Sequence, residues 1–435
     1  MRSNPSRLAA WDIVWAILVL GYTLFGRSFA YLGIPSQSLF IGEVTLFVFL
    51  LTRPRKILTD WLAWAIGFRG RPMALLALGL ALFFFYGFFE ALRGLFVLEH
   101  EKLVVLRNLA FNIYPFYLFL GILVGKRNPR LSRGLIPFLG WATGIYGVLY
   151  VFFLDQLDFR LPWAEEVALF PMPSGSAISM LALLALGSDL KGFWPCFLVN
   201  CFVVLCTQVR AEWLTIFLGG LVWFIVRRDV IRAASLVSAP VAILLCMYLF
   251  EVSMEGLQLR GGEISPEGIL ARFIAPINPD WAATLLGDEA YAFAGTITSW
   301  RAEWWGGIWE EVHREGSSPT LGLGYGYPLH SASRFISEEI PTPHNIFFYA
   351  LGYGGWIGVS AFYLFQLTLA FALSKAMTRS GNPLGMMLWA GLLAAAHFGN
   401  SLEAPFGAIP FYLLLGYSLA PISNGEERPS SELSR

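Results

Sequence analysis

A histidine and an asparagine stand together at the start of a long apolar run, in TPHNIFFYALGYGGWIG (342–358). Thr342 can cap a helix and Pro343 suits the first helical turn, so the pattern predicts a helix that begins here, with His344 in that turn. The positive end of the helix dipole disfavours an imidazolium. A neutral imidazole can act as a general base, although the same ring could merely satisfy an interface hydrogen bond.

An arginine interrupts the apolar face of an amphipathic helix that the sequence predicts within 298–315 (TSWRAEWWGGIWEEVHRE). Arg301 falls in the middle of that face, where a guanidinium must reach water or meet an anion. It could snorkel with cation–π contact to tryptophans, or it could bind an anionic substrate. The helix is suited to a membrane interface. At about 100° per residue, its apolar face carries Trp304, Trp305, Ile308 and Val312, flanked by Trp300 and Trp309.

Two further arginines lie at the ends of apolar runs, on what we expect to be the same side of a membrane. Arg210, in CTQVRAEWLTIF, lies where the chain must turn between two spans, and it could pair with Glu212 or bind an anion. Arg107, in LRNLAFNIY, begins another span. It could be a further cation for the same anion, or it could snorkel to the interface.

Alternating glycines occur in TLGLGYGYPLH (320–330), after the predicted amphipathic helix. Gly322, Gly324 and Gly326 permit a tight turn in which backbone segments approach closely. Alternatively, the backbone around Gly322, Gly324 and Tyr325 could contact a phosphate or a sugar.

The composition indicates a polytopic helical membrane protein. Of the 435 residues, 56% are hydrophobic and 14% are charged, whereas a soluble protein has about 25% charged residues. The net charge of zero gives no indication of a nucleic-acid partner. The four cysteines lie in apolar runs without a CxxC pair, which argues against a disulfide or a zinc site.

Twelve apolar runs predict an all-α fold with about twelve transmembrane helices. Lysines and arginines in alternate loops place both termini in the cytoplasm. Residues 1–250 then hold spans one to nine, 251–343 form one large extracytoplasmic loop with amphipathic helices, 344–422 hold spans ten to twelve, and 423–435 form a cytoplasmic tail. The centres of the runs lie near residues 20, 45, 82, 117, 144, 180, 200, 219, 241, 359, 391 and 413.

Four segments, in a fixed order and on one predicted side of the membrane, carry a family resemblance. They are VRAEWLTIFLGGL, WRAEWWGGIW, LGLGYG and PHNIFFYALGYGGWIG. This set resembles the O-antigen ligase and polymerase superfamily of bacterial envelopes over about residues 194–365, and the layout of spans around one large outer loop extends the likeness to the whole chain. Many relatives have a serine before the first arginine, where this chain has Val209.

The resemblance implies an inverting glycosyltransferase that needs no metal or other cofactor. Its donor would be a glycan on a polyprenyl diphosphate, and its acceptor a lipid A–core sugar or another glycan, at the periplasmic face of the bacterial inner membrane. Membrane lipids would surround it. The first outer loop, RSFAYLGIPSQ (27–37), has no carboxylate. Metal-dependent membrane glycosyltransferases often place one there, so arginines would have to bind the diphosphate instead.

The resemblance also assigns roles to residues. Arg210 and Arg301 match the family's two arginines and would bind the diphosphate, while His344 would take the proton from the acceptor hydroxyl. Asn345 would orient His344. The remaining candidate substrate contacts are Arg107, Gly322, Gly324 and Tyr325.

Several functions remain open at this point. A ligase transfers finished polymer to lipid A–core, a polymerase extends a lipid-linked chain, and a protein O-oligosaccharyltransferase uses a serine or threonine acceptor. The compact loop motifs favour the ligase. A twelve-span secondary transporter should show repeat symmetry and polar residues at the midplane, whereas here the ionisable residues gather at one face. A scaffold for envelope assembly without catalytic activity is the remaining alternative.

Overall fold

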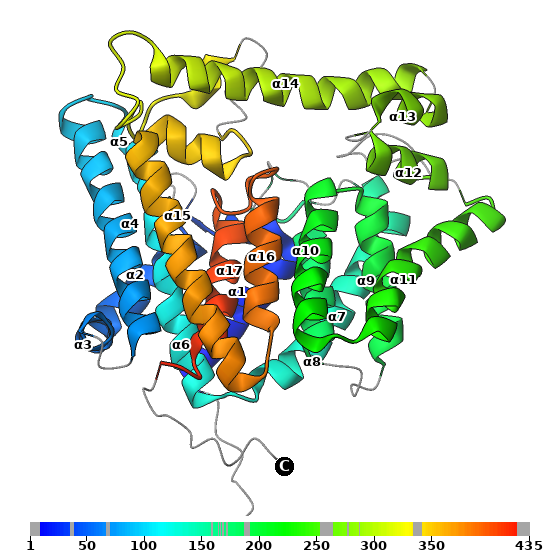
Figure 1. Ribbon diagram of the computed structural model, residues 1–435, viewed down its shortest axis with the longest axis horizontal. Coiled ribbons are helices and arrows are strands. Elements are labelled where there is room, and N and C mark those ends of the chain that lie inside the picture. The colour runs from blue at the N-terminus through cyan, green and yellow to red at the C-terminus, as the bar shows by residue number, and fades with distance from the viewer. Residues whose placement is uncertain are drawn as a thin grey trace, which may run out of the picture.

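The computed structural model is built almost entirely of helices (Figure 1). The all-α prediction is confirmed, with one addition. Two strands of two residues each, β1 (Gly33–Ile34) and β2 (Leu39–Phe40), pair in antiparallel fashion. The structure describes residues 9–34, 39–66, 70–157, 160–163, 165, 167, 169–170, 173–186, 192–252, 264–275, 278–286, 288–333 and 342–423.

The helices follow one another with short connections over most of the chain. The first group is α1 (Ala10–Ala30), α2 (Ile41–Thr52), α3 (Pro54–Ala65), α4 (Arg71–Phe96), α5 (Lys102–Ile113), α6 (Tyr117–Arg127), α7 (Leu131–Leu149), α8 (Pro173–Leu186), α9 (Phe193–Thr207), α10 (Arg210–Arg227) and α11 (Val230–Leu249). The second group is α12 (Pro266–Ile274), α13 (Pro279–Leu286), α14 (Asp288–His313), the short 3-10 helix η5 (Leu329–Ala332), α15 (Ile346–Ser380), α16 (Leu384–Ala395) and α17 (Pro405–Leu419).

Six helices in the described part of the chain are long and apolar enough to cross a bilayer. They are α1, α4, the continuous stretch Lys102–Arg127, the stretch Gly134–Leu154, α11 and α15. The shorter apolar helices are α2, α8, α9, α16 and α17. Every predicted centre falls inside a helix, and α10 accounts for the one near residue 219. The chain therefore has the helices of a membrane protein, while the count of twelve spans stays a prediction.

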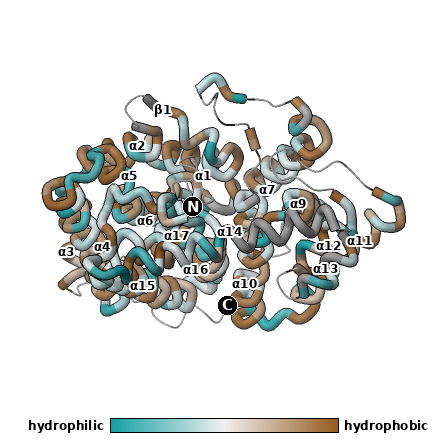
Figure 2. Tube along the Cα trace, turned by 90° about the horizontal axis from the view of Figure 1, so that it is seen from above, coloured by the Kyte–Doolittle hydropathy of each residue, from teal (hydrophilic) through white to brown (hydrophobic). Residues whose placement is uncertain are grey.

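Most of the helices stand side by side, and α12, α13 and α14 lie across one end of this bundle (Figure 1). The last described residues, which follow α17 and are coloured red, lie at the opposite end. Seen from above, stretches of hydrophobic residues occur in many of the helices around the bundle (Figure 2). Large apolar side chains such as Phe85 and Ile231 are 61% and 81% exposed. An apolar rim of this kind suits contact with lipid tails.

Small residues let some of these helices approach closely. A side chain at Gly121 of α6 would collide with backbone of α17, and one at Gly416 of α17 would collide with backbone of α6. Thr215 of α10 and Gly391 of α16 meet in the same way. Such contacts are typical of helices packed inside membranes, where close backbone approach replaces the hydrophobic effect as the source of cohesion.

The predicted amphipathic helix is present as the C-terminal part of α14. Trp304, Ile308 and Val312 are fully buried, as the helical periodicity predicts, and Trp309 is 41% exposed at the edge. The buried face contacts protein: the indole of Trp304 donates a hydrogen bond to the carbonyl of Leu329 at 2.7 Å. Its tryptophans therefore fasten α14 to the bundle, which corrects the expectation that this face lies against the membrane. The side chain of Trp300 lies outside the described residues.

The longest helix, α15, is broken in its first half. Gly355 has φ 57° and ψ −158°, so the helical hydrogen bonds cannot continue past it. Four backbone hydrogen bonds from the segment 319–324 satisfy the groups that this break releases. The amides of Leu323 and Gly324 donate to the carbonyls of Gly352 and Tyr353, with N···O distances of 2.8 and 3.0 Å. In the other direction, the amides of Trp356 and Ile357 in α15 donate to the carbonyls of Pro319 and Thr320 at 3.0 and 3.1 Å.

An ion pair on α4 holds that segment in place. The Arg93 guanidinium donates to the carbonyls of Leu321 and Gly322 at 2.9 and 3.0 Å. It also pairs at 2.9 Å with Glu90, whose side chain is fully buried. The hydroxyl of Tyr86 bonds to Glu90 at 3.0 Å and to the carbonyl of Gly354 at the break. The alternating glycines therefore serve close backbone packing, the first of their two predicted roles.

Gly322→Ala should lower stability more than a matched glycine substitution. Gly322 has φ 69°, and a side chain there would collide with the backbone of Gly355. Gly316 has φ 91° but has open space around it, so Gly316→Ala carries only the backbone strain of about 1 kcal/mol. We expect a clearly larger fall in the apparent melting temperature for Gly322→Ala in detergent. Equal falls would show that the contact with α15 contributes nothing.

Candidate functional site

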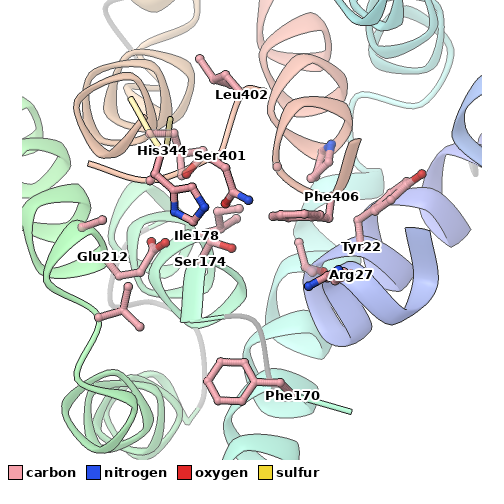
Figure 3. A pocket seen from close by; sticks show the side chains of 18 of the residues that line it. Tyr22, Arg27, Phe170, Ser174, Ile178, Glu212, His344, Ser401, Leu402 and Phe406 are labelled. Carbon is pink, nitrogen blue, oxygen red and sulfur yellow. The ribbon is translucent and has the colours of Figure 1, made fainter. Parts of the chain in front are cut away.

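A cavity of about 420 Å³ opens at the end of the bundle that α14 covers (Figure 3). Its wall is formed by the last turns of α1, the first turns of α8, α10 and α17, and the end of α16 with the loop that follows. Arg301 and His344, two of the predicted catalytic residues, both line it. Aromatic and aliphatic side chains form much of the remaining wall, among them Phe25, Phe170, Ile178, Leu392 and Phe406.

His344 lies just before α15 and not within its first turn. The helix begins at Ile346, and Asn345 is its N-cap, because the Asn345 carboxamide oxygen accepts hydrogen bonds from the amides of Phe347 and Phe348 at 2.9 and 3.4 Å. The expected cap at Thr342 was wrong, since asparagine caps at least as well as threonine and stands at the true helix start. The structure thus gives Asn345 a capping role.

The backbone of His344 is in the left-handed region, with φ 54°. Residues other than glycine seldom adopt this conformation, and it often marks a functional position. It turns the chain sharply before the helix and directs the imidazole into the cavity (Figure 3). The carboxylate of Glu212, from the first turn of α10, also points into the cavity.

Glu403 lies behind this turn, in the loop between α16 and α17. Both of its carboxylate oxygens are buried and make no hydrogen bond of normal geometry. The loss of water raises the pKa of Glu403 to about 8, and the nearby Thr342 hydroxyl and the backbone amides of His344 and Asn345 lower it only partly. The carboxyl group of Glu403 is therefore mostly protonated and neutral near neutral pH, close to the backbone of His344 and Asn345.

Arg301 reaches the cavity from α14. Its guanidinium donates to the carbonyl of Phe398 at 3.2 Å, in the loop after α16. One turn further along α14, the indole of Trp305 donates to the carbonyl of Pro343 at 2.8 Å. This bond ties α14 to the residue before His344, so Arg301 and His344 are held in register.

Arg210 is the first residue of α10, at the rim of the cavity. Its chain neighbours Val209, Ala211 and Glu212 line the cavity, but its own side chain is not among the lining groups. The structure therefore brings two of the three predicted catalytic residues into one cavity and places the third beside it.

The other predicted substrate contacts lie away from this cavity. Tyr325 is buried, and its hydroxyl donates to Asn112. Gly322 and Gly324 pack against the break in α15 and against Leu98, respectively. Arg107 is exposed on α5. For these residues the structure shows local contacts within the fold, and substrate contact stays a prediction.

Two residues at this site, Glu403 and Arg27, were not predicted from the sequence. Glu403 is the only carboxylate in NSLEAPFG, between the last two apolar runs, and its isolation there was the available signal. Arg27 falls in the segment predicted as the first outer loop, and the structure places it in the last turn of α1. The described residues contain no group of three or more His, Cys, Asp or Glu side chains that could hold a metal ion.

The comparison with protein families coincides with this site. Residues 195–363 match the family model described as O-Antigen ligase. This match supports the O-antigen ligase and polymerase superfamily. The matched region contains Arg210, Arg301 and His344 and ends within α15. No curated protein matches the chain.

This match supports a coarse function. The matched family suggests a ligase- or polymerase-type glycosyltransferase activity, and it implies lipid-linked glycan donors and glycan acceptors. The resemblance stated from the sequence motifs is thereby confirmed. Arg27 and Glu403 lie outside the matched residues, so what they do must be argued from the structure.

Replacing Glu403 with Gln should change how stability depends on pH. The folded-state pKa of about 8 lies above the ordinary value of a glutamate. The folded state therefore binds more protons, and the free energy of unfolding of the wild type should fall as pH rises from about 4 through 8, by an amount on the order of a few kcal/mol. Glu403→Gln does not titrate and should escape this fall.

The measurement is the apparent melting temperature of both proteins between pH 5 and 9. Glu310→Gln, at an exposed position on α14, is the matched control and should follow the wild type. If the difference in melting temperature between the wild type and Glu403→Gln is the same at every pH, the carboxyl group at this position is not neutral in the folded protein. The same conclusion follows if the wild type becomes more stable relative to the variant as the pH rises.

Proposed function

We propose that the chain is an O-antigen ligase-like transferase that moves a glycan from a polyprenyl diphosphate to a sugar hydroxyl of lipid A–core. The observation that carries this proposal is that His344 and Arg301 line one partly apolar cavity at the end of a bundle of membrane helices. A base and a cation beside apolar walls suit a substrate whose reacting end is an anion and whose tail is a lipid.

The chemistry follows from these side chains. His344 accepts the proton of the acceptor hydroxyl, and the oxygen attacks the anomeric carbon from the face opposite the diphosphate, with inversion. The bond between the anomeric carbon and the phosphate oxygen breaks, and the diphosphate leaves with the electron pair. Arg301, with Arg210 at the rim, stabilises the charge that develops on this leaving group. No external energy source or nucleotide is consumed.

Glu403 and Trp305 act as positioning residues in this scheme. The buried carboxyl group of Glu403 supports the backbone turn at His344, and Trp305 fixes Pro343 against α14. A base within hydrogen-bond reach of its proton contributes only when its orientation is fixed. Asn345 contributes by capping α15 directly after the base.

The proposed location is the periplasmic face of the bacterial inner membrane, with both termini in the cytoplasm. Two observations support it. The cavity lies at the end of the bundle that α14 covers, and α14 belongs to the loop predicted to be extracytoplasmic. The described residues that follow α17 lie at the opposite end (Figure 1), on the side where the cation-rich loops were expected.

The experiment uses purified protein in lipid with a polyprenyl-diphosphate oligosaccharide, with and without a lipid A–core acceptor. Transfer only when the core is present supports the ligase. Lengthening of the lipid-linked glycan without a core would instead identify a polymerase, the runner-up. Protein O-glycosylation is tested by adding a serine-containing acceptor peptide.

Variants test the assigned roles in the same assay. We expect His344→Ala to lower kcat by about 10²- to 10⁴-fold, because it removes the base, and Arg301→Ala to lower kcat/KM by about 10²-fold or more. His313→Ala is the control, since His313 is exposed on α14 and does not line the cavity. If both cavity variants match wild type with a competent donor, the glycosyl-transfer proposal is wrong and a transporter or a scaffold becomes the better account.

A further inference from the structure

Arg27 is a cation that the proposed chemistry does not use, although it lines the same cavity. It follows Gly26, which interrupts α1 with φ 47° and ψ −114°. Beyond this kink the chain turns back, and Phe29 packs edge-on against Tyr22 with ring centroids 5.0 Å apart. The turn buries Ser28, Phe29 and Ala30 but leaves Arg27 exposed. The fold of α1 thus presents this one side chain to the cavity.

The guanidinium of Arg27 points into the cavity from the wall opposite His344, beside Tyr22 and Phe406 (Figure 3). Its contacts among the described residues are with Tyr31 alone: a hydrogen bond to the hydroxyl at 3.3 Å and a position 5.7 Å from the ring centroid. A tyrosine neutralises no charge. Among the described residues, therefore, no carboxylate forms an ion pair with this cation.

The charged side chains that line the described cavity wall are Arg27, Arg301 and Glu212. Glu212 offsets one of the two lining arginines. Without Arg27, the lining side chains would have no net positive charge for a diphosphate diester, which carries two negative charges, and Arg210 beside the cavity would be the remaining cation. With Arg27 the wall retains one unbalanced guanidinium, whose planar donors match phosphate oxygens.

The positions of the two arginines assign them to different phosphates. Arg301 is tied through Trp305 to the residue before His344, so it lies at the side where the sugar must react. Arg27 lies across the cavity next to Phe406 and Tyr22, and aromatic side chains in this wall suit an apolar chain. We infer that Arg27 binds the phosphate attached to the polyprenyl chain, while Arg301 binds the phosphate attached to the sugar. This inference rests on the proposed function, because it assumes a lipid diphosphate donor.

The test compares the binding of polyprenyl monophosphate and polyprenyl diphosphate to the full-length protein in lipid nanodiscs. Polyprenyl monophosphate carries only the phosphate next to the chain. Arg27→Gln should therefore weaken the binding of both lipids by about tenfold or more, the loss expected for a charge-assisted contact. Arg301→Gln should weaken only the diphosphate. Arg314→Gln should change neither, because Arg314 is exposed, pairs with Glu311 at 2.6 Å and does not line the cavity.

Arg27→Lys keeps the charge but loses the planar fork, so it should bind both lipids with intermediate affinity. If Arg27→Gln lowers the apparent melting temperature, the binding comparison uses Arg27→Lys instead. The inference is overturned if the Arg27 variants bind polyprenyl monophosphate as tightly as the wild type does. If the wild type also prefers the diphosphate in that case, the proposed function remains intact. A wild type that binds neither lipid overturns both.

Discussion

The break in α15 at Gly355 is the constraint on which the rest of the site depends. A helix in an apolar environment cannot leave backbone groups unpaired, because each one costs several kcal/mol in the absence of water. Here the segment 319–324 supplies the missing partners through four backbone hydrogen bonds. The break therefore requires the loop that precedes α15 to fold back onto it.

This requirement links the outer loop to the histidine. The segment that covers the break follows α14 in the chain, and Arg93 and Glu90 of α4 brace it. Because that segment is fixed, α14 can pack its tryptophan face onto η5 and bring Arg301 and Trp305 to the turn at His344. Glu403, in the loop between α16 and α17, lies close to the same turn. The cavity is thus assembled from distant parts of the chain around one interrupted helix.

The sequence predicted the elements well and their long-range contacts less well. Apolar runs located the helices, and the 3.6-residue period identified the buried face of α14, because both signals are local. The sequence predicted Thr342 as the N-cap of α15, whereas the structure has Asn345 there, because several neighbouring residues are of types that can cap a helix. Glu403 was missed because its importance comes from burial against residues about 60 positions earlier, which no local pattern reports. The membrane-facing assignment for α14 failed for a related reason: periodicity shows which face is apolar but not what covers it.

The most direct measurement is a cryo-electron-microscopy structure of the protein in a lipid nanodisc with a polyprenyl-diphosphate donor bound. The account predicts that the diphosphate lies in the cavity between Arg27 and Arg301, with the sugar next to His344 and the lipid chain along the aromatic wall. A diphosphate bound elsewhere on the bundle, with the cavity at His344 left without substrate, would contradict it.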